Sequence, residues 1–109
     1  MPEASERIAE LRRELDSHPA SRQFYQLGEL LRRDKRAADA IAVLRAGLVH
    51  HPRYVAAWVA LARACLDRSI PADAATALHE ALELDAHNPV AWRLLGEARL
   101  GSGDRFGAL

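Results

Sequence analysis

The sequence predicts an all-α protein in which antiparallel helix pairs stack into an α-solenoid. Three observations support this fold class: a motif that recurs every 34 residues, a composition rich in alanine and poor in strand-forming residues, and connections of only a few residues between helices. A strict period of this length is typical of helical repeat arrays. Short connections force consecutive helices to lie side by side and antiparallel.

The repeated motif is an aromatic residue followed by a leucine three positions later and then a small residue. It occurs at residues 24–28, 58–62 and 92–96, as Phe-Tyr-Gln-Leu-Gly, Trp-Val-Ala-Leu-Ala and Trp-Arg-Leu-Leu-Gly. The two intervals are equal and contain no insertion. Each unit of such an array contacts only its neighbours, and the stacked units form one extended surface. The period therefore favours a function in surface recognition over one in catalysis.

Composition and charge exclude several functional classes. Half of the 109 residues are hydrophobic, so one domain or a fragment of one can build a core. Fifteen basic residues are mixed with fifteen acidic ones, which leaves no basic stripe for nucleic acid or an anionic membrane. No apolar run approaches the ~20 residues that span a bilayer, and the N-terminus has no apolar signal region. We therefore expect no nucleic acid, no membrane insertion and a cytoplasmic location.

The first predicted helix covers residues 3–16. Ile8, Leu11 and Leu15 lie three and four positions apart, as a single helical face requires. The sequence Ser17-His18-Pro19 ends this helix. Apart from that one face the segment is polar, which is typical of a helix with a core on one side only.

Five further helices are predicted, over about residues 22–33, 37–50, 54–67, 71–84 and 89–100. Pro71 opens the fourth of these, because proline is tolerated in a first helical turn. Asn88 caps the last, and Pro89 takes its first helical position. Gly101-Ser102-Gly103 ends it, and residues 104–109 are expected to begin another helix.

The middle unit explains why the repeated residues are needed. Two stripes face each other, Trp58, Leu61, Ala62 and Cys65 on the first helix and Ala74, Leu78, Ala81 and Leu82 on the second. Large side chains fill the space between the helices, and small ones let the backbones approach to about 8–10 Å. Glycine inside a helix costs ~1 kcal/mol relative to alanine. Gly28, Gly47 and Gly96 therefore predict close packing at their positions.

The pattern resembles the tetratricopeptide repeat, whose signature is aromatic-x2-Leu-Gly-x2-large, then Ala-x3-large, Ala and Pro. The second unit has Ala86 where proline is expected, and the third has Arg99 in place of a large apolar residue. The matched residues are Phe24, Leu27, Gly28, Leu31, Ala40, Leu44, Gly47 (for the usual Ala) and Pro52; Trp58, Leu61, Ala62, Cys65, Ala74, Leu78 and Ala81; and Trp92, Leu95, Gly96 and Ala108.

The resemblance covers residues 21–109 and implies a right-handed superhelix in a single domain, 1–109. Its parts would be an N-terminal capping helix at 3–19, full repeats at 21–54 and 55–88, and a partial third repeat at 89–109. The apolar residues of the first helix precede Pro19 by 11, 8 and 4 positions, as Ile41, Leu44 and Leu48 precede Pro52. The first helix therefore imitates the second helix of a repeat.

The C-terminal end is expected to differ from the N-terminal one. The third repeat stops at Ala108-Leu109, where its second helix would begin. A solenoid end without a polar cap exposes apolar surface. We therefore expect either that the chain was cut from a longer protein or that helix 89–100 is covered by another chain, and self-association is a predicted consequence.

No residues are predicted to form a catalytic, cofactor or metal site. His50 and His51 are adjacent and point about 100° apart on a helix, and His18, His79 and His87 have no partner at the spacing of a zinc-binding helix. Cys65 lies in a core stripe and is interpreted as a small packed hydrophobe. The pairs of glutamates lie on helical faces with other charges nearby, which is typical of a solvated surface.

In the family that the chain resembles, the first helix of each repeat lines an inner groove. Steps of 34 residues then give rows of aligned side chains, such as Glu29, Arg63 and Glu97. From the residues in these rows we expect the groove to be largely apolar with a few charges. The predicted partner-binding residues are Arg22, Tyr25, Gln26, Glu29, Ala56, Val59, Ala60, Arg63, Leu66, Val90, Arg93, Leu94 and Glu97. Repeats that grip the C-terminal carboxylate of chaperones carry Lys and Asn where this chain has Tyr25 and Glu29, so that clamp is absent.

The predicted function is that of a protein–protein interaction scaffold or adaptor, with no enzymatic activity. The groove suits a helix or an extended apolar peptide from a protein partner, and equally a downstream segment of the same chain or a second copy. Tyr25, Val59, Arg63, Arg93 and Leu94 are the first choices as contacts, and aspartate at Val59 and Leu94 is predicted to abolish binding while helicity is retained. Two alternatives are self-association through the uncapped C-terminal face and a regulatory region of a larger enzyme.

Overall fold

The computed structural model describes residues 2–101 and their side chains from residue 4 onward. This part of the chain consists of six α-helices and contains no strand: α1 (Pro2–Ser17), α2 (Phe24–Arg33), α3 (Ala37–His50), α4 (Val55–Asp67), α5 (Pro71–Leu84) and α6 (Pro89–Gly101). The all-α solenoid fold class is therefore confirmed. The expected turn of a further helix at residues 104–109, with Ala108 of the third repeat, lies outside the described residues.

All six helices begin and end within two residues of the predicted positions, and local chemistry explains several of these ends. Asn88 caps α6, where its Oδ1 accepts a hydrogen bond of 2.9 Å from the backbone N–H of Ala91. Pro71 occupies the start of α5. The turns after α2 and α4 both place a non-glycine residue at positive φ, Lys35 at 64° and Ser69 at 58°. These two residues lie one period apart, so the repeat extends to the backbone of the turns.

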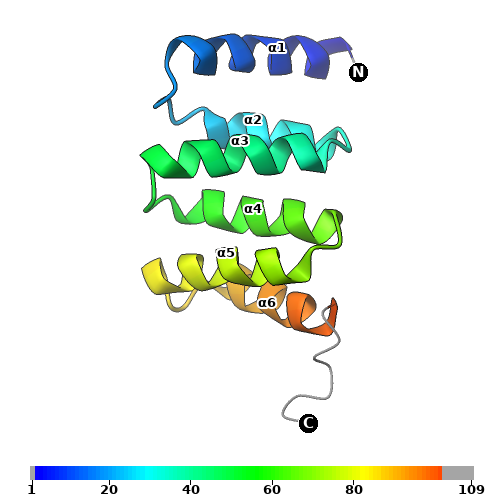
Figure 1. Cartoon of the computed structure of the whole chain (residues 1–109), viewed down its shortest axis with the longest axis vertical. Coiled ribbons are helices and arrows are strands. Elements are labelled where there is room, and N and C mark those ends of the chain that lie inside the picture. The colour runs from blue at the N-terminus through cyan, green and yellow to red at the C-terminus, as the bar shows by residue number, and fades with distance from the viewer. Residues whose placement is uncertain (1, 102–109) are drawn as a thin grey trace.

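The helices stack along one axis, with α1 at one end and α6 at the other (Figure 1). The first helices of successive pairs adjoin, since α2 contacts α4 and α4 contacts α6. The second helices do not, because α3 and α5 have no Cα atoms within 8 Å of each other. The stack is therefore closed on the face built by α2, α4 and α6 and open on the face built by α1, α3 and α5.

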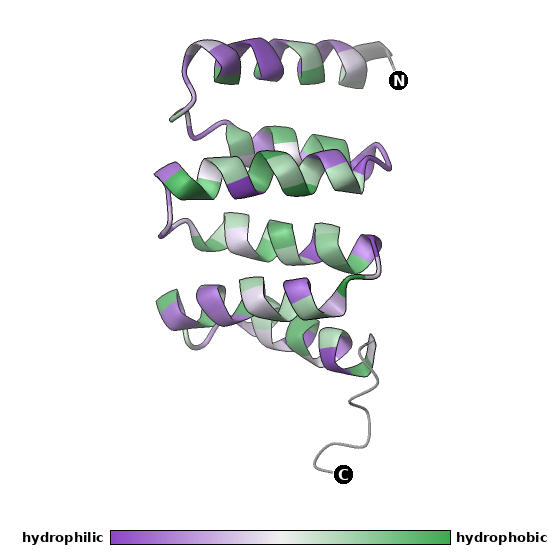
Figure 2. Ribbon diagram, viewed as in Figure 1, coloured by the Kyte–Doolittle hydropathy of each residue, from purple (hydrophilic) through white to green (hydrophobic). Residues whose placement is uncertain are grey.

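The core runs along the interior of the stack, and every buried residue among the described ones is apolar. Figure 2 shows α1 as mostly hydrophilic and α4, in the middle of the stack, as mostly hydrophobic. Among the residues of α1 whose side chains are described, Ile8 and Leu11 alone are buried, whereas six residues of α4 are. This contrast matches the prediction of a first helix that has a core on one side only.

The phase of the repeat is confirmed by two equivalent hydrogen bonds. The indole N–H of Trp58 donates to the carbonyl oxygen of Pro52, and that of Trp92 donates to the carbonyl oxygen of Ala86, both at 2.8 Å. Donor and acceptor are six residues apart in each case, and the two bonds are one period apart. The aromatic residues that head the motif therefore hold corresponding positions in the stack.

The glycine predictions are confirmed at two positions and wrong at the third. A Cβ atom on Gly28 would lie 2.6 Å from Leu44, and one on Gly47 would lie 2.0 Å from the ring of Phe24. At Gly96 a Cβ atom would meet nothing within 4 Å, and the residue is exposed. Gly96 faces no following helix among the described residues, so nothing there requires close approach.

Candidate functional site

The closed face of the stack, which we call the inner face, is where the first helices α2, α4 and α6 adjoin. It is hollowed by two cavities. The first inner cavity, of about 190 Å³, is lined by Tyr25, Glu29, Ala56, Val59, Ala60, Arg63, Asn88 and Val90. The second inner cavity, of about 310 Å³, is lined by Arg32, Arg63, Leu66, Asp67, Arg93, Leu94 and Glu97. Each cavity draws residues from all three helices or their ends, so the face is continuous across the pairs.

The structure places eleven of the thirteen sequence-predicted residues in the lining of these cavities. The other two interact elsewhere. The guanidinium of Arg22 lies over the ring of Tyr54, 4.3 Å from its centroid. The side-chain oxygen of Gln26 accepts a hydrogen bond of 3.2 Å from Arg7 of α1. Sequence spacing alone did not reveal that α1 reaches this row.

Two of the residues that line the cavities are core residues. Ala60 is buried, and Leu94 is only 4% exposed. The prediction that aspartate at Leu94 would leave helicity intact is therefore wrong, because it would bury a carboxylate in the core. Val59 is partly exposed and also packs against the core. Ala56 is exposed in the first inner cavity and offers a better position for probing it.

The two cavities differ in polarity. Five of the eight residues that line the first have an apolar or aromatic side chain, Val59 and Val90 among them, but polar and apolar atoms share its surface about equally. Five of the seven residues that line the second are charged. The expectation of a largely apolar groove is therefore wrong: the first cavity is of mixed polarity, and in the second Leu66 and Leu94 lie among ion pairs.

Most of the charges on the inner face neutralise one another. Arg32 lies 3.5 Å from Glu29 and 3.5 Å from Asp67, so that one guanidinium pairs with two carboxylates, one on α2 and one at the end of α4. Arg93 pairs with Glu97 at 3.3 Å on α6. Oε1 of Glu29 and Nε of Arg32 are buried and make no hydrogen bond. The pair of Arg32 with Asp67, which is also a hydrogen bond of 3.5 Å from Nη1 of Arg32 to Oδ2 of Asp67, thus joins α2 to the end of α4.

Tyr25 closes the first inner cavity beside Tyr54, with ring centroids 5.3 Å apart. Burial raises the pKa of the Tyr25 hydroxyl, and the nearby carboxylate of Glu29 raises it further, while Arg63 acts in the opposite direction. Tyr25 is therefore neutral at physiological pH and offers an amphipathic surface, one that suits contact with a peptide.

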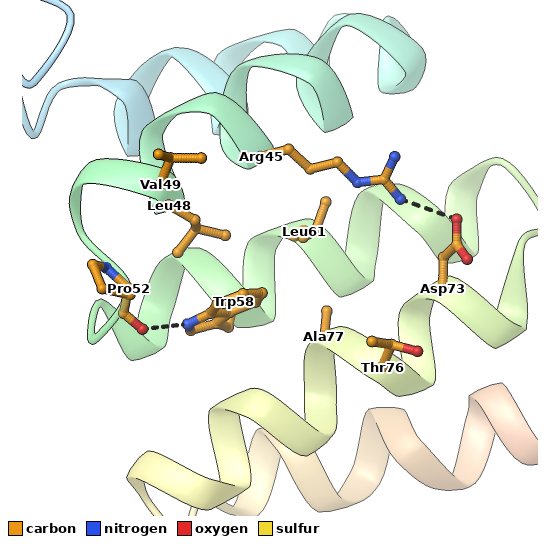
Figure 3. A pocket seen from close by; sticks show the side chains of 9 residues that line it. All are labelled: Arg45, Leu48, Val49, Pro52, Trp58, Leu61, Asp73, Thr76 and Ala77. Carbon is orange, nitrogen blue, oxygen red and sulfur yellow. Dashed lines mark hydrogen bonds and ion pairs between the residues drawn. The ribbon is translucent and has the colours of Figure 1, made fainter.

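The open face carries a hollow that the sequence did not predict, and we call it the outer pocket (Figure 3). It has a volume of about 440 Å³ and is lined by Arg45, Leu48, Val49, Pro52, Trp58, Leu61, Asp73, Thr76 and Ala77. Figure 3 shows the ion pair between Arg45 and Asp73 at one end and the hydrogen bond from Trp58 to Pro52 at the other. The ion pair has a length of 3.0 Å. Val49 lies on its rim and is 78% exposed.

A smaller hollow of about 260 Å³ lies one unit earlier, between α1 and α3, and is lined by Arg12, Leu15, Asp16, Pro19, Phe24, Leu27, Val43, Ala46, Gly47 and His50. Both hollows arise because the second helices do not adjoin. The recurrence explains the outer pocket as a product of the stacking geometry. An apolar residue outside the core stripe, Val49, was the one signal in the sequence that could have indicated it.

His51 and Cys65 both pack against other residues of the fold. His51 stacks on Phe24 with centroids 5.8 Å apart and contacts the carbonyl oxygen of Ala20 at 2.6 Å through Nε2. Cys65 is buried, and desolvation raises the pKa of its thiol. Within residues 2–101, no group of three or more His, Cys, Asp or Glu side chains could hold a metal ion. None of the helices described is both long and apolar enough to cross a membrane.

The family comparison agrees with this architecture. The model of the tetratricopeptide repeat family matches residues 21–64, which contain α2, α3 and most of α4. No curated protein matches the chain. Repeats of this family generally mediate protein–protein interaction and are typically non-catalytic. The match identifies a tetratricopeptide repeat at residues 21–64, and the six helices and the 34-residue phase of the Trp58 and Trp92 hydrogen bonds support the same kind of repeat along the described chain.

Proposed function

We propose that the inner face binds a peptide or a helix of a protein partner, and that the chain acts as an interaction scaffold or adaptor. One observation supports this above the others: the first helices of three successive pairs contribute to two adjacent cavities along one face. A first cavity of mixed polarity and a charged second cavity give a surface that can distinguish one peptide sequence from another.

The proposed site is not of the carboxylate-clamp type. The positions that would carry Lys and Asn hold Tyr25 and Glu29, and both line the first inner cavity. Glu29 is already paired with Arg32. A C-terminal carboxylate bound at the clamp positions themselves would meet the Glu29 carboxylate and the neutral Tyr25 phenol, so we propose that the ligand is an internal segment.

The test uses peptides selected from a random display library against the wild-type chain. Ala56→Trp fills the first inner cavity with an uncharged side chain at an exposed position and should weaken binding of the selected peptides at least tenfold, about 1.4 kcal/mol. Ala42→Trp places the same side chain on an exposed position of α3, outside the inner face, and should leave binding unchanged. Circular dichroism checks that both variants remain helical.

Two outcomes would contradict the proposal. One is that no peptide is selected from the library. The other is that the selected peptides bind the Ala56→Trp variant as tightly as the wild type, since a ligand seated in the first inner cavity cannot tolerate an indole there. Isothermal titration calorimetry supplies both affinities.

The surface of α6 supports a second candidate function, self-association. Trp92 is 53% exposed and Leu100 is 58% exposed, and they are the large hydrophobic residues that α6 leaves uncovered in the described part of the chain. A second copy could cover them. Sedimentation equilibrium should then show a concentration-dependent mass that Leu100→Lys abolishes. A wild-type chain that stays monomeric at high concentration would contradict this candidate.

Three further sequence expectations belong to the proposal. We retain the division into a capping helix (3–19), two full repeats (21–54 and 55–88) and a partial third repeat (89–109). A cytoplasmic location is also part of the proposal. A regulatory role beside a catalytic region in a longer protein is compatible with the same binding face.

A further inference from the structure

Arg63 is the one residue that lines both inner cavities. It lies on α4, in the middle of the stack, and is partly exposed. Among the described residues it has no carboxylate within ion-pair distance. Every other charged residue in the linings has one: ion pairs of 3.3–3.9 Å occupy Glu29, Arg32, Asp67, Arg93 and Glu97.

This difference arises from the way the charges are shared. The two cavities contain three arginines and three carboxylates, Arg32, Arg63, Arg93, Glu29, Asp67 and Glu97. Arg32 takes both Glu29 and Asp67, and Arg93 takes Glu97. Arg63 is therefore left as a guanidinium without a counter-charge, on a surface where neighbouring side chains reduce its contact with water.

A guanidinium in this situation has a defined chemical preference. It stays protonated in proteins, and its planar fork of N–H donors matches a carboxylate in a bidentate geometry. Partial burial strengthens the interaction with an arriving anion, because less water competes for the charge. Around it lie Val59 and Val90 on one side and Leu66 on the other, so the groups beside the anion should be apolar.

We infer that Arg63 pairs with the side-chain carboxylate of a single Asp or Glu in the bound peptide or helix, an inference that rests on the function proposed above. The cavities open on both sides of Arg63, so a segment that fills both carries its acidic residue at an internal position. Glu29 and Glu97 occupy the same row one period before and after Arg63. Additional acidic residues would meet these carboxylates, so the partner carries one acidic residue between apolar ones and not an acidic run.

The test uses the display-selected peptides, whose C-termini are fused to the carrier and so offer no terminal carboxylate. One internal position should be enriched in Asp or Glu. Synthetic peptides with amidated C-termini then carry Glu, Gln or Lys at that position. The wild-type chain should bind the Glu peptide about tenfold more tightly than the Gln peptide, as expected for a charge-assisted pair.

Variants assign this preference to Arg63. Arg63→Gln should bind the Glu and Gln peptides equally, and Arg63→Glu should prefer the Lys peptide. Arg13→Gln, an equivalent change at an exposed position of α1 outside the inner face, should keep the tenfold preference. Circular dichroism spectra of the Arg63 variants should match the wild type, because Arg63 forms no ion pair with the described residues.

The outcomes separate this inference from the proposed function. If Ala56→Trp abolishes binding while the selected peptides lack an acidic position, or while Arg63→Gln keeps the preference for Glu, the inference about Arg63 is wrong and the inner face still binds peptides. Binding that requires a free C-terminal carboxylate would overturn it as well. If Ala56→Trp has no effect, the inner-face proposal fails and this inference fails with it.

Discussion

Phe24 and Trp92 hold the same position in the 34-residue period but lie near opposite ends of the stack. Phe24 is 1% exposed. Its ring is stacked on His51, meets Tyr54 edge-on with centroids 5.5 Å apart, and lies against the backbone of Gly47. It is enclosed because α3 and the connection after α3 follow it.

Trp92 lies at the other end of the stack, where no further helix is described. It is half exposed, and the hydrogen bond from its indole to Ala86 is the same one that Trp58 makes to Pro52. Trp58, in the middle unit, is partly buried. The comparison teaches that the motif sets how a residue is oriented, whereas the next helix pair sets how deeply it is buried.

The largest expected effect separates the two aromatic residues. Phe24→Ala should lower the free energy of unfolding by about 3–5 kcal/mol, because it leaves a cavity in a packed core. Trp92→Ala should lower it by about 1 kcal/mol or less, since it removes one hydrogen bond and a half-exposed ring. Urea denaturation followed by circular dichroism measures both. Equal losses at the two positions would mean that Trp92 is covered as Phe24 is.

A smaller effect, opposite in sign at the two ends, is expected for glycine. Gly28 and Gly96 are one period apart, and the middle unit has Ala62 there. Gly28→Ala should cost about 1 kcal/mol net, because the clash with Leu44 outweighs the gain in helix propensity. Gly96→Ala meets nothing and should raise stability by up to about 1 kcal/mol. Thermal and urea denaturation of both variants check the sign, and destabilisation at Gly96 would indicate a neighbour that packs against it.

Most of the fold could be predicted from the sequence, because its signals are local and repeated. Asn88, Pro71 and the facing stripes that contain Leu61 and Leu78 each act through neighbours within a few turns or within one helix pair. Gly96 was misread for a different reason. At Gly28, which holds the same repeat position as Gly96, a glycine is required because Leu44 packs against it. The sequence pattern does not say whether another helix covers a given glycine, so it could not distinguish Gly96 from Gly28.

The candidate site was less accessible to sequence reasoning. The period identified which residues line the inner face, but it could not distinguish the buried Leu94 from its exposed neighbours. It could not assign ion pairs either, since Arg32 reaches a carboxylate 35 residues away and thereby leaves Arg63 without one. The outer pocket depends on the separation of α3 from α5, a property of the stack that no single helix encodes.

The last prediction compares a thiol in the middle of the stack with a thiol at its α6 end, and it concerns alkaline pH. Cys65 and Arg99 are one period apart; the first is buried and the second exposed. Desolvation by burial raises the pKa of the Cys65 thiol above its ordinary value of 9.0. Of two smaller contributions, that of Arg45 lowers this pKa and that of Asp73 raises it. The folded state therefore favours the neutral thiol, whose contribution to stability is complete below the unfolded pKa and is lost as pH rises through the folded pKa.

The free energy of unfolding should accordingly fall above pH 9, by at most about 1.4 kcal/mol per pH unit for this group. Cys65→Ala should flatten that slope between pH 8 and about pH 10, the range below the raised pKa of Tyr25, whose ordinary value is 10.0. The double variant Cys65→Ala/Arg99→Cys carries the thiol at the exposed end and should stay as flat as Cys65→Ala. Urea denaturation at each pH measures the slopes. If the slope returned with the thiol at position 99, water would be excluded from this end of the stack as it is from the middle. The difference in exposure between Phe24 and Trp92 would then need another explanation.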